Sequence, residues 1–275
     1  MGEHNFFTLA TMKILSLLLF VVFILACNRN PYAVTNKQYK KQAKELSKII
    51  RQAPPTDSIG SWVGTTNFNL RKPNLVIIHH TAQNSCEQTL KTFTNTKTEV
   101  SAHYVVCREG TIHHMLNDYL RGWHGGAGKW GSVTDINSSS IGIELDNNGT
   151  EPFSEMQVSN LMLLLEVLKK AYNIPAANFI GHADIAPTRK VDPSIFFPWK
   201  RLAEKGFGNW YSDTTGQIVT ADFKNIDALK IIGYDVKDST AAIRAFRIHF
   251  LQDTLAILDE PAQKILFSLY KNLNN

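Results

Sequence analysis

Residues 75–81 read Leu-Val-Ile-Ile-His-His-Thr, and this stretch decides the fold. An apolar run of this length predicts a buried strand. The strand runs directly into His79, so an imidazole stands where the strand ends and faces a site at the edge of the sheet. His80 points to the opposite face because neighbouring side chains alternate along a strand, and it is therefore a poor partner for His79 in a shared site.

A second stretch, residues 181–193, reads Gly-His-Ala-Asp-Ile-Ala-Pro-Thr-Arg-Lys-Val-Asp-Pro. Its two prolines predict a loop, because proline disfavours helix both at its own position and at the residue before it. His182 and Asp192 could bind a metal ion, and Lys190 could place a positive charge beside a substrate oxygen. Catalytic zinc usually takes three protein ligands and leaves a fourth position open. His79 is the best candidate for the third ligand.

The region around these stretches alternates between strand and helix patterns. A helix beginning at Ser154 has a capping box with Gln157. The other predicted segments are strands at residues 102–107, 111–115, 140–145 and 178–181 and a helix near residues 85–95. This order predicts an α/β fold with a mixed central sheet flanked by helices.

Glu144 lies inside the apolar strand formed by residues 141–145. Alternation places Gly142 and Glu144 on one face of that strand and the two isoleucines on the other. A carboxylate in such a strand is costly unless another group pairs with it. Two explanations for Glu144 stay open. It could form a buried ion pair with Arg121 or Arg189, or it could have a catalytic role.

Five motifs together resemble the type 2 N-acetylmuramoyl-L-alanine amidases, a family that includes phage endolysins and the animal peptidoglycan recognition proteins. The motifs occur in the family's order, and the resemblance covers roughly residues 60–275. They are residues 77–82, 101–104, 123–125, 141–145 and 181–193.

The resemblance implies one Zn²⁺ ion held by His79, His182 and Asp192. It also implies that Glu144 is the general base for the attacking water, and that Lys190 stabilises the oxyanion together with zinc. The bond cleaved would be the amide between N-acetylmuramic acid and L-alanine in peptidoglycan or its muropeptide fragments.

Four further residues are expected to contact the substrate. They are His103, Tyr104, Trp123 and His124. The two histidines could instead support the ligands from behind, and the two aromatic residues could equally belong to the core. Two other functions stay open, a peptidoglycan-binding protein without catalysis and a zinc peptidase that cuts within the stem peptide. No His-Glu-x-x-His motif occurs, so the common metalloprotease pattern is missing.

Residues 1–26 have the composition of a secretory signal, with an apolar run that is short for a membrane span. Residues 24–27 read Ile-Leu-Ala-Cys and resemble a bacterial lipobox, in which Cys27 receives the lipid and becomes the first residue of the mature chain. We therefore expect a lipid-anchored protein of the cell envelope, in the outer membrane and facing the periplasm. An uncleaved anchor and soluble secretion are the alternatives.

Residues 27–57 are predicted to be a tether with an amphipathic helix that packs on the next domain or contacts anionic lipid. The amidase domain is expected at residues 58–208. Residues 209–275 resemble a peptidoglycan-binding domain of three helices, near residues 222–232, 240–251 and 260–273. A bundle that only stabilises the enzyme would have the same pattern.

The chain has 29 basic and 24 acidic residues, and this mild excess without an evident cationic block argues against a nucleic-acid partner. We expect a monomer. Cys86 and Cys107 could pair in an oxidising envelope. Cys86 stands where some recognition proteins of the family place a disulfide cysteine, but Thr92 replaces the usual partner, so the pairing stays open.

Overall fold

The computed structural model describes residues 30–51, 65, 67, 70 and 72–273. The chain divides into two compact units, residues 1–68 and 69–275. The predicted signal peptide and Cys27 lie outside the described residues. Within the described part, no helix combines the length and the apolar character needed to cross a bilayer.

The first unit contains helix α2 (Ala33–Arg51), which has no buried residue. It holds six basic residues and one acidic residue, and the rest of the chain has 23 of each. The whole positive excess of the protein is therefore carried by this single helix. The expectation that no cationic block exists was wrong, because the overall count hides how the charges are distributed.

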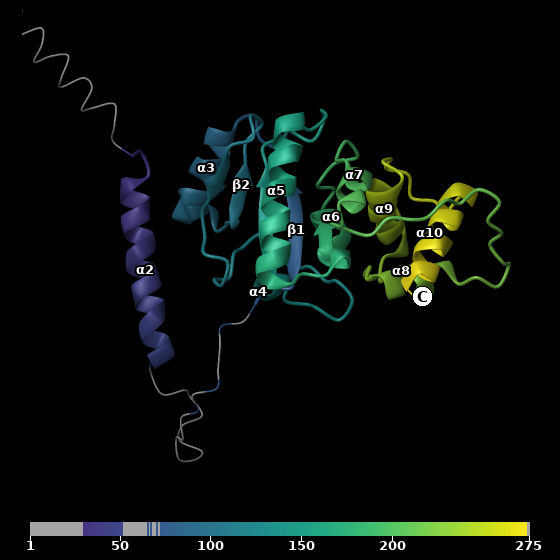
Figure 1. Cartoon of the computed structure of the whole chain (residues 1–275), viewed down its shortest axis with the longest axis horizontal. Coiled ribbons are helices and arrows are strands. Elements are labelled where there is room, and N and C mark those ends of the chain that lie inside the picture. The colour runs from purple at the N-terminus through teal and green to yellow at the C-terminus, as the bar shows by residue number, and fades with distance from the viewer. Residues whose placement is uncertain (1–29, 52–64, 66, 68–69, 71, 274–275) are drawn as a thin grey trace, which may run out of the picture. The chain divides into compact units, whose positions relative to one another are not determined.

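The second unit contains the predicted alternation of strands and helices (Figure 1). Its first half comprises β1 (Leu75–His80), α3 (Cys86–Thr94), η2 (Thr96–Thr98), β2 (Tyr104–Val106), β3 (Ile112–His114), α4 (Ile136–Ser139), β4 (Ser140–Leu145) and α5 (Glu155–Tyr172). Its second half comprises η3 (Ala176–Asn178), β5 (Phe179–Gly181), α6 (His182–Ile185), α7 (Trp199–Glu204), α8 (Asn225–Ile232), α9 (Ser239–Phe250) and α10 (Glu260–Leu273).

The five strands form one mixed sheet in the order β3-β2-β4-β1-β5. Strand β1 lies between β4 and β5 and is parallel to both, whereas β3 is antiparallel at the edge. His79 of β1 is in register with Glu144 of β4, and Val105 of β2 is in register with Glu144 on its other side. The predicted fold class, a mixed sheet flanked by helices, is confirmed.

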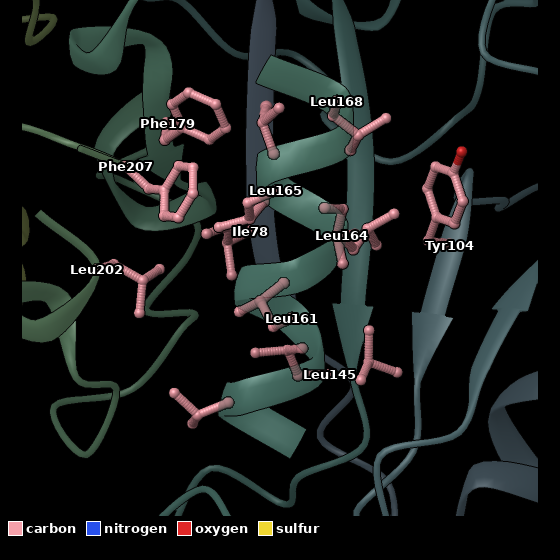
Figure 2. Packing of buried hydrophobic residues seen from close by; sticks show 14 of the residues in the cluster. Ile78, Tyr104, Leu145, Leu161, Leu164, Leu165, Leu168, Phe179, Leu202 and Phe207 are labelled. Atoms are coloured by element: carbon pink, nitrogen blue, oxygen red, sulfur yellow. The ribbon is translucent and has the colours of Figure 1, made fainter. Parts of the chain in front are cut away.

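Helix α5 covers one face of the sheet (Figure 2). Ser154 accepts a hydrogen bond from the Gln157 backbone at the start of this helix, as the capping box predicted, and Asn173 ends it in a left-handed conformation. The buried cluster includes Ile78, Ile143 and Leu145 from the sheet and Leu161, Leu164, Leu165 and Leu168 from α5. Because side chains alternate, His79, Gly142 and Glu144 are left on the other face.

The 181–193 stretch is not entirely a loop, because its first four residues after Gly181 form the one-turn helix α6. The Asp184 carboxylate accepts a hydrogen bond from the Gly181 backbone N–H at 2.7 Å and so caps this turn. The prolines do prevent continuation, since the turn ends before Pro187. The expectation of a helix-free loop was wrong only for this turn.

The C-terminal helices α8, α9 and α10 share a second buried cluster. Ala183 of α6 belongs to the same cluster, and α6 lies beside α9 (Figure 1). The C-terminal helices are thus packed against the 181–193 stretch. The predicted division of this unit at residue 208 stays a prediction.

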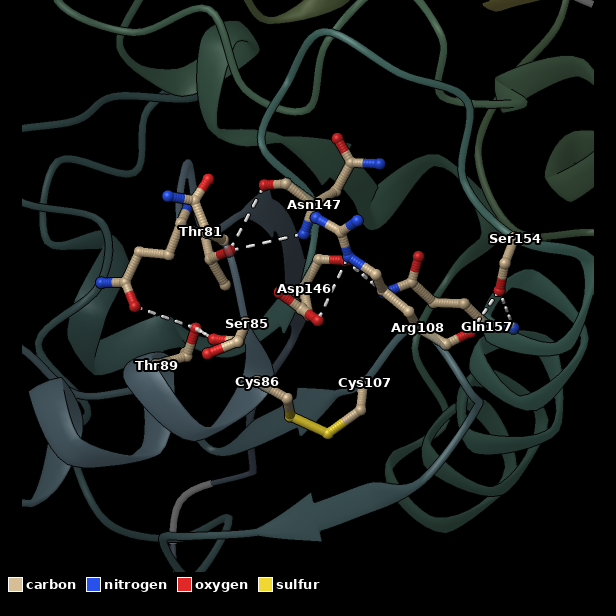
Figure 3. A network of polar contacts seen from close by, with 12 residues as sticks. Thr81, Ser85, Cys86, Thr89, Cys107, Arg108, Asp146, Asn147, Ser154 and Gln157 are labelled. Atoms are coloured by element: carbon tan, nitrogen blue, oxygen red, sulfur yellow. Dashed lines mark hydrogen bonds and ion pairs between the residues drawn. A yellow bond between two sulfur atoms is a disulfide. The ribbon is translucent and has the colours of Figure 1, made fainter.

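Cys86 and Cys107 form a disulfide, which settles the pairing that the sequence left open. The bond joins the start of α3 to the end of β2 (Figure 3). Beside it, the Gln157 side chain donates to the backbone oxygens of Val106 and Asp146 at 2.9 and 3.1 Å. The disulfide and these bonds join α3, β2, β4 and α5 at one end of the sheet.

Candidate metal centre

Three side chains that are far apart in the sequence meet at the carboxyl end of β1. The Nδ1 atoms of His79 and His182 are 2.9 Å apart, and Asp192 Oδ2 lies 3.2 Å from the first and 3.0 Å from the second. All three residues are buried. The structure therefore brings together the three residues that the sequence analysis named as ligands, in one group that could hold a metal ion.

The spacing of these donors suits a tetrahedral zinc ion. With Zn–N and Zn–O distances near 2.1 Å, neighbouring ligand atoms are separated by about 3.4 Å. The three atoms here lie 2.9 to 3.2 Å from one another, and two imidazoles with one carboxylate are a donor set that zinc accepts. The residues present fit a single divalent cation.

A chain of hydrogen bonds behind His79 fixes which of its nitrogens is free. Ser140 Oγ donates to the Ile136 carbonyl at 2.6 Å, because a carbonyl oxygen can only accept. Ser140 Oγ then accepts from His124 Nε2 at 3.3 Å, which leaves His124 Nδ1 to accept from His79 Nε2 at 3.1 Å. His79 therefore presents the lone pair of Nδ1 to the metal position.

The protonation states agree with this chain of donors. Burial, with His182 nearby, lowers the pKa of His79 to about 4. Burial also lowers the pKa of His124 well below its usual value, with a further contribution from His79. Both rings are therefore neutral at neutral pH, which is the form that binds a metal ion.

Gly142 provides the space in which His124 lies. A Cβ at this position would meet His124 ring atoms at 2.3, 2.5 and 2.6 Å. The Gly142 N–H also donates to His103 Nδ1 at 3.0 Å, and His103 Nε2 donates to the Leu120 carbonyl at 3.0 Å. Sequence reasoning missed this role of Gly142, although a glycine inside a strand is itself a signal of close approach.

The expected substrate contacts of His103 and His124 are corrected by this arrangement. His103 is fully buried and both of its ring nitrogens are occupied by the backbone. His124 is also buried, and its nitrogens bond to His79 and Ser140. His124 therefore supports the donor His79 from behind, which was the alternative left open for it. His103 holds the backbone of Gly142 and Leu120 and lies edge-on to the His124 ring, with ring centroids 5.8 Å apart.

The two aromatic residues differ from each other. Tyr104 is buried on the α5 face of the sheet, where its hydroxyl donates to Asp118 at 3.1 Å. The substrate contact expected for Tyr104 is therefore wrong, because it points away from the metal ligands. Trp123 is 50% exposed and directly precedes His124 in the chain, so its ring is free to contact a substrate.

His80 lies outside the donor group, as strand alternation predicted. Its Nδ1 accepts a hydrogen bond from the Ser194 backbone N–H at 3.1 Å. Ser194 follows two residues after Asp192. His80 therefore helps to hold the segment that carries the third ligand.

Glu144 has the environment of a proton acceptor beside the three donors. Its Oε1 lies 4.0 Å from His79 Nδ1, and its Oε2 is buried with no hydrogen-bond partner among the described residues. Burial, together with the charge of Asp192, raises the pKa of Glu144 to about 8. A carboxylate whose pKa lies near neutrality is suited to accepting and returning a proton.

The ion-pair explanation for Glu144 does not hold. Arg121 pairs with Asp135 at 3.2 Å, and Arg189 donates to the Ala127 carbonyl at 2.8 Å. Among the described residues, Lys190 places a positive charge close enough to act on Glu144. Its charge partly offsets the rise in the pKa of Glu144 and adds to the lowering of the pKa of His79. Lys190 is half-buried.

The mixed sheet, the two imidazoles with a carboxylate, and the Glu144 oxygen that has no partner among the described residues define a site suited to metal-assisted hydrolysis. A sequence profile of the N-acetylmuramoyl-L-alanine amidase family matches residues 69–195, which contain all of these groups. Among its relatives, the chain is similar to N-acetylmuramoyl-L-alanine amidase AmiD of Escherichia coli. The identity is 32% over 207 aligned residues, which cover 64% of this chain and 74% of that protein.

The chain is also similar to 1,6-anhydro-N-acetylmuramyl-L-alanine amidase AmpD of Haemophilus influenzae, with 38% identity over 103 residues. That match covers 37% of this chain and 56% of AmpD, so it spans just over half of the relative. A solved complex of AmiD from E. coli with anhydro-N-acetylmuramic acid-L-Ala-D-γ-Glu-L-Lys aligns with a TM-score of 0.67. The identity is 29%, and the alignment covers 76% of this chain and 93% of that chain.

The chain therefore belongs to the type 2 N-acetylmuramoyl-L-alanine amidase family. It is an N-acetylmuramoyl-L-alanine amidase, a hydrolase that acts on peptidoglycan or its muropeptide fragments.

Proposed function

We propose that this amidase is zinc-dependent, and that it cleaves the amide between N-acetylmuramic acid and L-alanine. His79, His182 and Asp192 would hold the single Zn²⁺ ion. The observation that carries the proposal is the buried oxygen of Glu144, which has no partner in the part of the chain that the structure describes and lies next to three converging donor atoms. A zinc ion at this position would supply a Lewis acid and would lower the pKa of a water molecule.

The protein groups have separate tasks in this proposal. Glu144 accepts a proton from the water that attacks the amide carbon, and it later gives that proton to the leaving amine nitrogen. Lys190 places its positive charge near the carbonyl oxygen, where negative charge develops. The exposed ring of Trp123 provides an apolar wall for the sugar or the stem peptide.

A muropeptide digest tests the reaction. We expect mass spectrometry to show free stem peptides that begin with L-alanine. Glu144→Gln should bind zinc as the wild type does and release no product, whereas an active Glu144→Gln protein would remove Glu144 from its role. Cleavage within the stem would support a zinc peptidase instead. Binding of muropeptides without cleavage by the wild type would support the non-catalytic alternative.

Elemental analysis tests the ligand set. His182→Ala and Asp192→Ala should each lose zinc, because two remaining ligands are too few for a stable site. His114→Ala is a matched control, since His114 is exposed on β3 and outside the donor group. Zinc retained at full occupancy by both ligand variants would contradict the proposed centre.

Lys190→Met tests the oxyanion role. The variant keeps the apolar part of the side chain and most of its length but removes its charge. We expect kcat to fall while KM changes little, since the charge is needed mainly when the carbonyl oxygen becomes negative. An unchanged kcat would exclude this role.

We further propose that the protein is lipid-anchored through Cys27 in the outer membrane and faces the periplasm. The lipobox-like residues 24–27 support the anchor, and the concentration of all excess positive charge in α2 supports a position near anionic headgroups. Labelled fatty acid should be incorporated into the wild type and be lost in Cys27→Ser. Incorporation into the Cys27→Ser protein would refute the anchor.

The basic face of α2 can be tested without the anchor. A chain that begins at Asn28 retains α2 and the whole of the second unit. We expect it to sediment with vesicles containing anionic lipid at low salt and to be released at high salt. Replacing Lys40, Lys41 and Lys44 with glutamine should abolish this binding, and equal binding to neutral vesicles would contradict the electrostatic explanation.

A further inference from the structure

Asp184 lies between the two ligands of the 181–193 stretch and is almost completely buried. Both of its oxygens are engaged. Oδ2 accepts from the Gly181 backbone N–H at 2.7 Å and from His249 Nδ1 at 2.8 Å, and Oδ1 accepts from the Tyr234 hydroxyl at 2.8 Å. Two of these three donors come from the C-terminal helical region, 50 and 65 residues further along the chain.

Asp184 is linked to both ligands of this stretch through the backbone. It caps the single turn of α6, and His182 is the first residue of that turn. The next backbone N–H, that of Ala183, donates to the Asp192 carbonyl at 2.7 Å. A shift of the turn would therefore move the His182 ring and the segment that carries Asp192 together.

The two C-terminal donors are themselves held in place. The His249 ring stacks on Trp199 with centroids 3.9 Å apart, and the Tyr234 ring packs edge-on against Trp130. Burial, together with the charge of Asp184, raises the pKa of Tyr234 well above its usual value, so its hydroxyl keeps the proton that it donates. Asp184 thus accepts hydrogen bonds from two side chains that are themselves held by packing.

We propose that Tyr234 and His249 are positioning residues for the metal site, and that the C-terminal helices set the metal affinity by holding Asp184. This inference rests on the proposed zinc site. The helices would then be part of the catalytic unit, in addition to any contact that they make with the cell wall. Groups that orient metal ligands from behind typically change metal affinity by about 10- to 100-fold when they are removed.

The test compares two variants that each delete one buried hydroxyl from the C-terminal region. Tyr234→Phe removes the bond to Asp184 and keeps the ring. Ser268→Ala removes the hydroxyl of Ser268 in α10, which accepts a hydrogen bond from the Ser212 backbone at 3.0 Å away from the donor group. Zinc affinity is measured on the full chain by competition with a chelator, and stability is measured by urea unfolding of the metal-free proteins.

We expect Tyr234→Phe to weaken zinc binding about 10-fold, and Ser268→Ala to leave it within about two-fold. Equal affinity for Tyr234→Phe and the wild type would overturn the inference. An equal loss in both variants would also overturn it, because the effect would then be a general loss of stability. A wild type that binds no zinc would refute the proposed function itself.

His249 offers a conservative rescue. In His249→Asn the side-chain amide nitrogen lies near the position of Nδ1 and can donate to Asp184, whereas His249→Leu has no donor. We expect zinc affinity to be closer to that of the wild type in the asparagine variant than in the leucine variant. The same affinity in both would show that His249 acts only through packing, and would overturn its positioning role.

Discussion

The substitution Gly142→Ala tests most directly how the sheet supports the metal ligands. A methyl group at this position would lie 2.3 to 2.6 Å from three atoms of the His124 ring. Ordinary contacts between heavy atoms are about 3.5 to 4.0 Å, so the ring must move by about 1 Å or more. The His79–His124 bond is 3.1 Å long, and a displacement of that size takes it beyond hydrogen-bonding distance.

The expected cost has two parts. Forcing extra volume into a packed interior costs about 1 to 3 kcal/mol, and a buried donor that loses its partner costs about 1 to 3 kcal/mol more. Replacing glycine by alanine returns up to about 1 kcal/mol by restricting the unfolded chain. We therefore expect the free energy of unfolding of the metal-free protein to fall by about 1 to 5 kcal/mol. Zinc affinity should fall by about 10-fold, since His79 is no longer oriented.

Urea unfolding of four proteins measures this cost and locates it. The proteins are the wild type, Gly142→Ala, His124→Ala and the double variant. Without the imidazole, the new methyl group enters vacated space, so adding Gly142→Ala to His124→Ala should cost less than about 1 kcal/mol. If Gly142→Ala costs the same in both backgrounds, the strain does not lie at His124 and the reasoning is refuted.

Three further outcomes are expected. Tyr104→Phe removes the hydrogen bond to Asp118, so the free energy of unfolding should fall by about 1 kcal/mol, while kcat and KM should stay unchanged. A tenfold drop in kcat/KM would show that Tyr104 contacts the substrate after all. Reduction of the Cys86–Cys107 disulfide, which spans 21 residues, should lower the free energy of unfolding by about 3 kcal/mol in urea, and identical curves with and without reductant would contradict this. The third outcome concerns pH. Burial raises the pKa of Glu144 from 4.5 to about 8, so between these pH values the folded state binds one proton more than the unfolded state. On acidification from pH 8 to 4.5, the metal-free wild type should therefore gain about 1.4 kcal/mol per pH unit relative to Glu144→Gln, and parallel stability profiles would refute the shift.

Local signals in the sequence predicted most of the fold. The apolar run before His79 gave the buried strand β1, and the cap formed by Ser154 and Gln157 gave the start of α5. Alternation alone placed Gly142 and Glu144 on one face of β4, where they are found. These features depend on residues that are close together in the chain, so they can be read without the tertiary structure.

The errors arose where the deciding partner is distant. Strand alternation places Tyr104 and Val105 on opposite faces of the sheet. Only the pairing of β2 with β4 shows that Val105, and therefore not Tyr104, lies on the face of Glu144. The turn of α6 was missed because its cap, Asp184, is fixed by side chains 50 and 65 residues away. His124 contacts His79 of β1 and Ser140 of β4. The motif at residues 123–125 does not show these contacts, because they depend on how the chain packs.

The two sides of the proposed metal site differ in how they are held. His79 and Glu144 lie on adjacent strands in register, so their separation is fixed by the sheet and by the bonds behind His79. His182 and Asp192 lie on a stretch outside the sheet and depend on contacts made through Asp184 and through the backbone. Perturbations of the C-terminal helices should therefore weaken metal binding before they disturb the position of Glu144 relative to His79. Such variants, once saturated with zinc, should recover a larger share of wild-type kcat than variants of the sheet do. The reason is that a bound ion would bring His182 and Asp192 back together, whereas no ligand can restore the register of two strands.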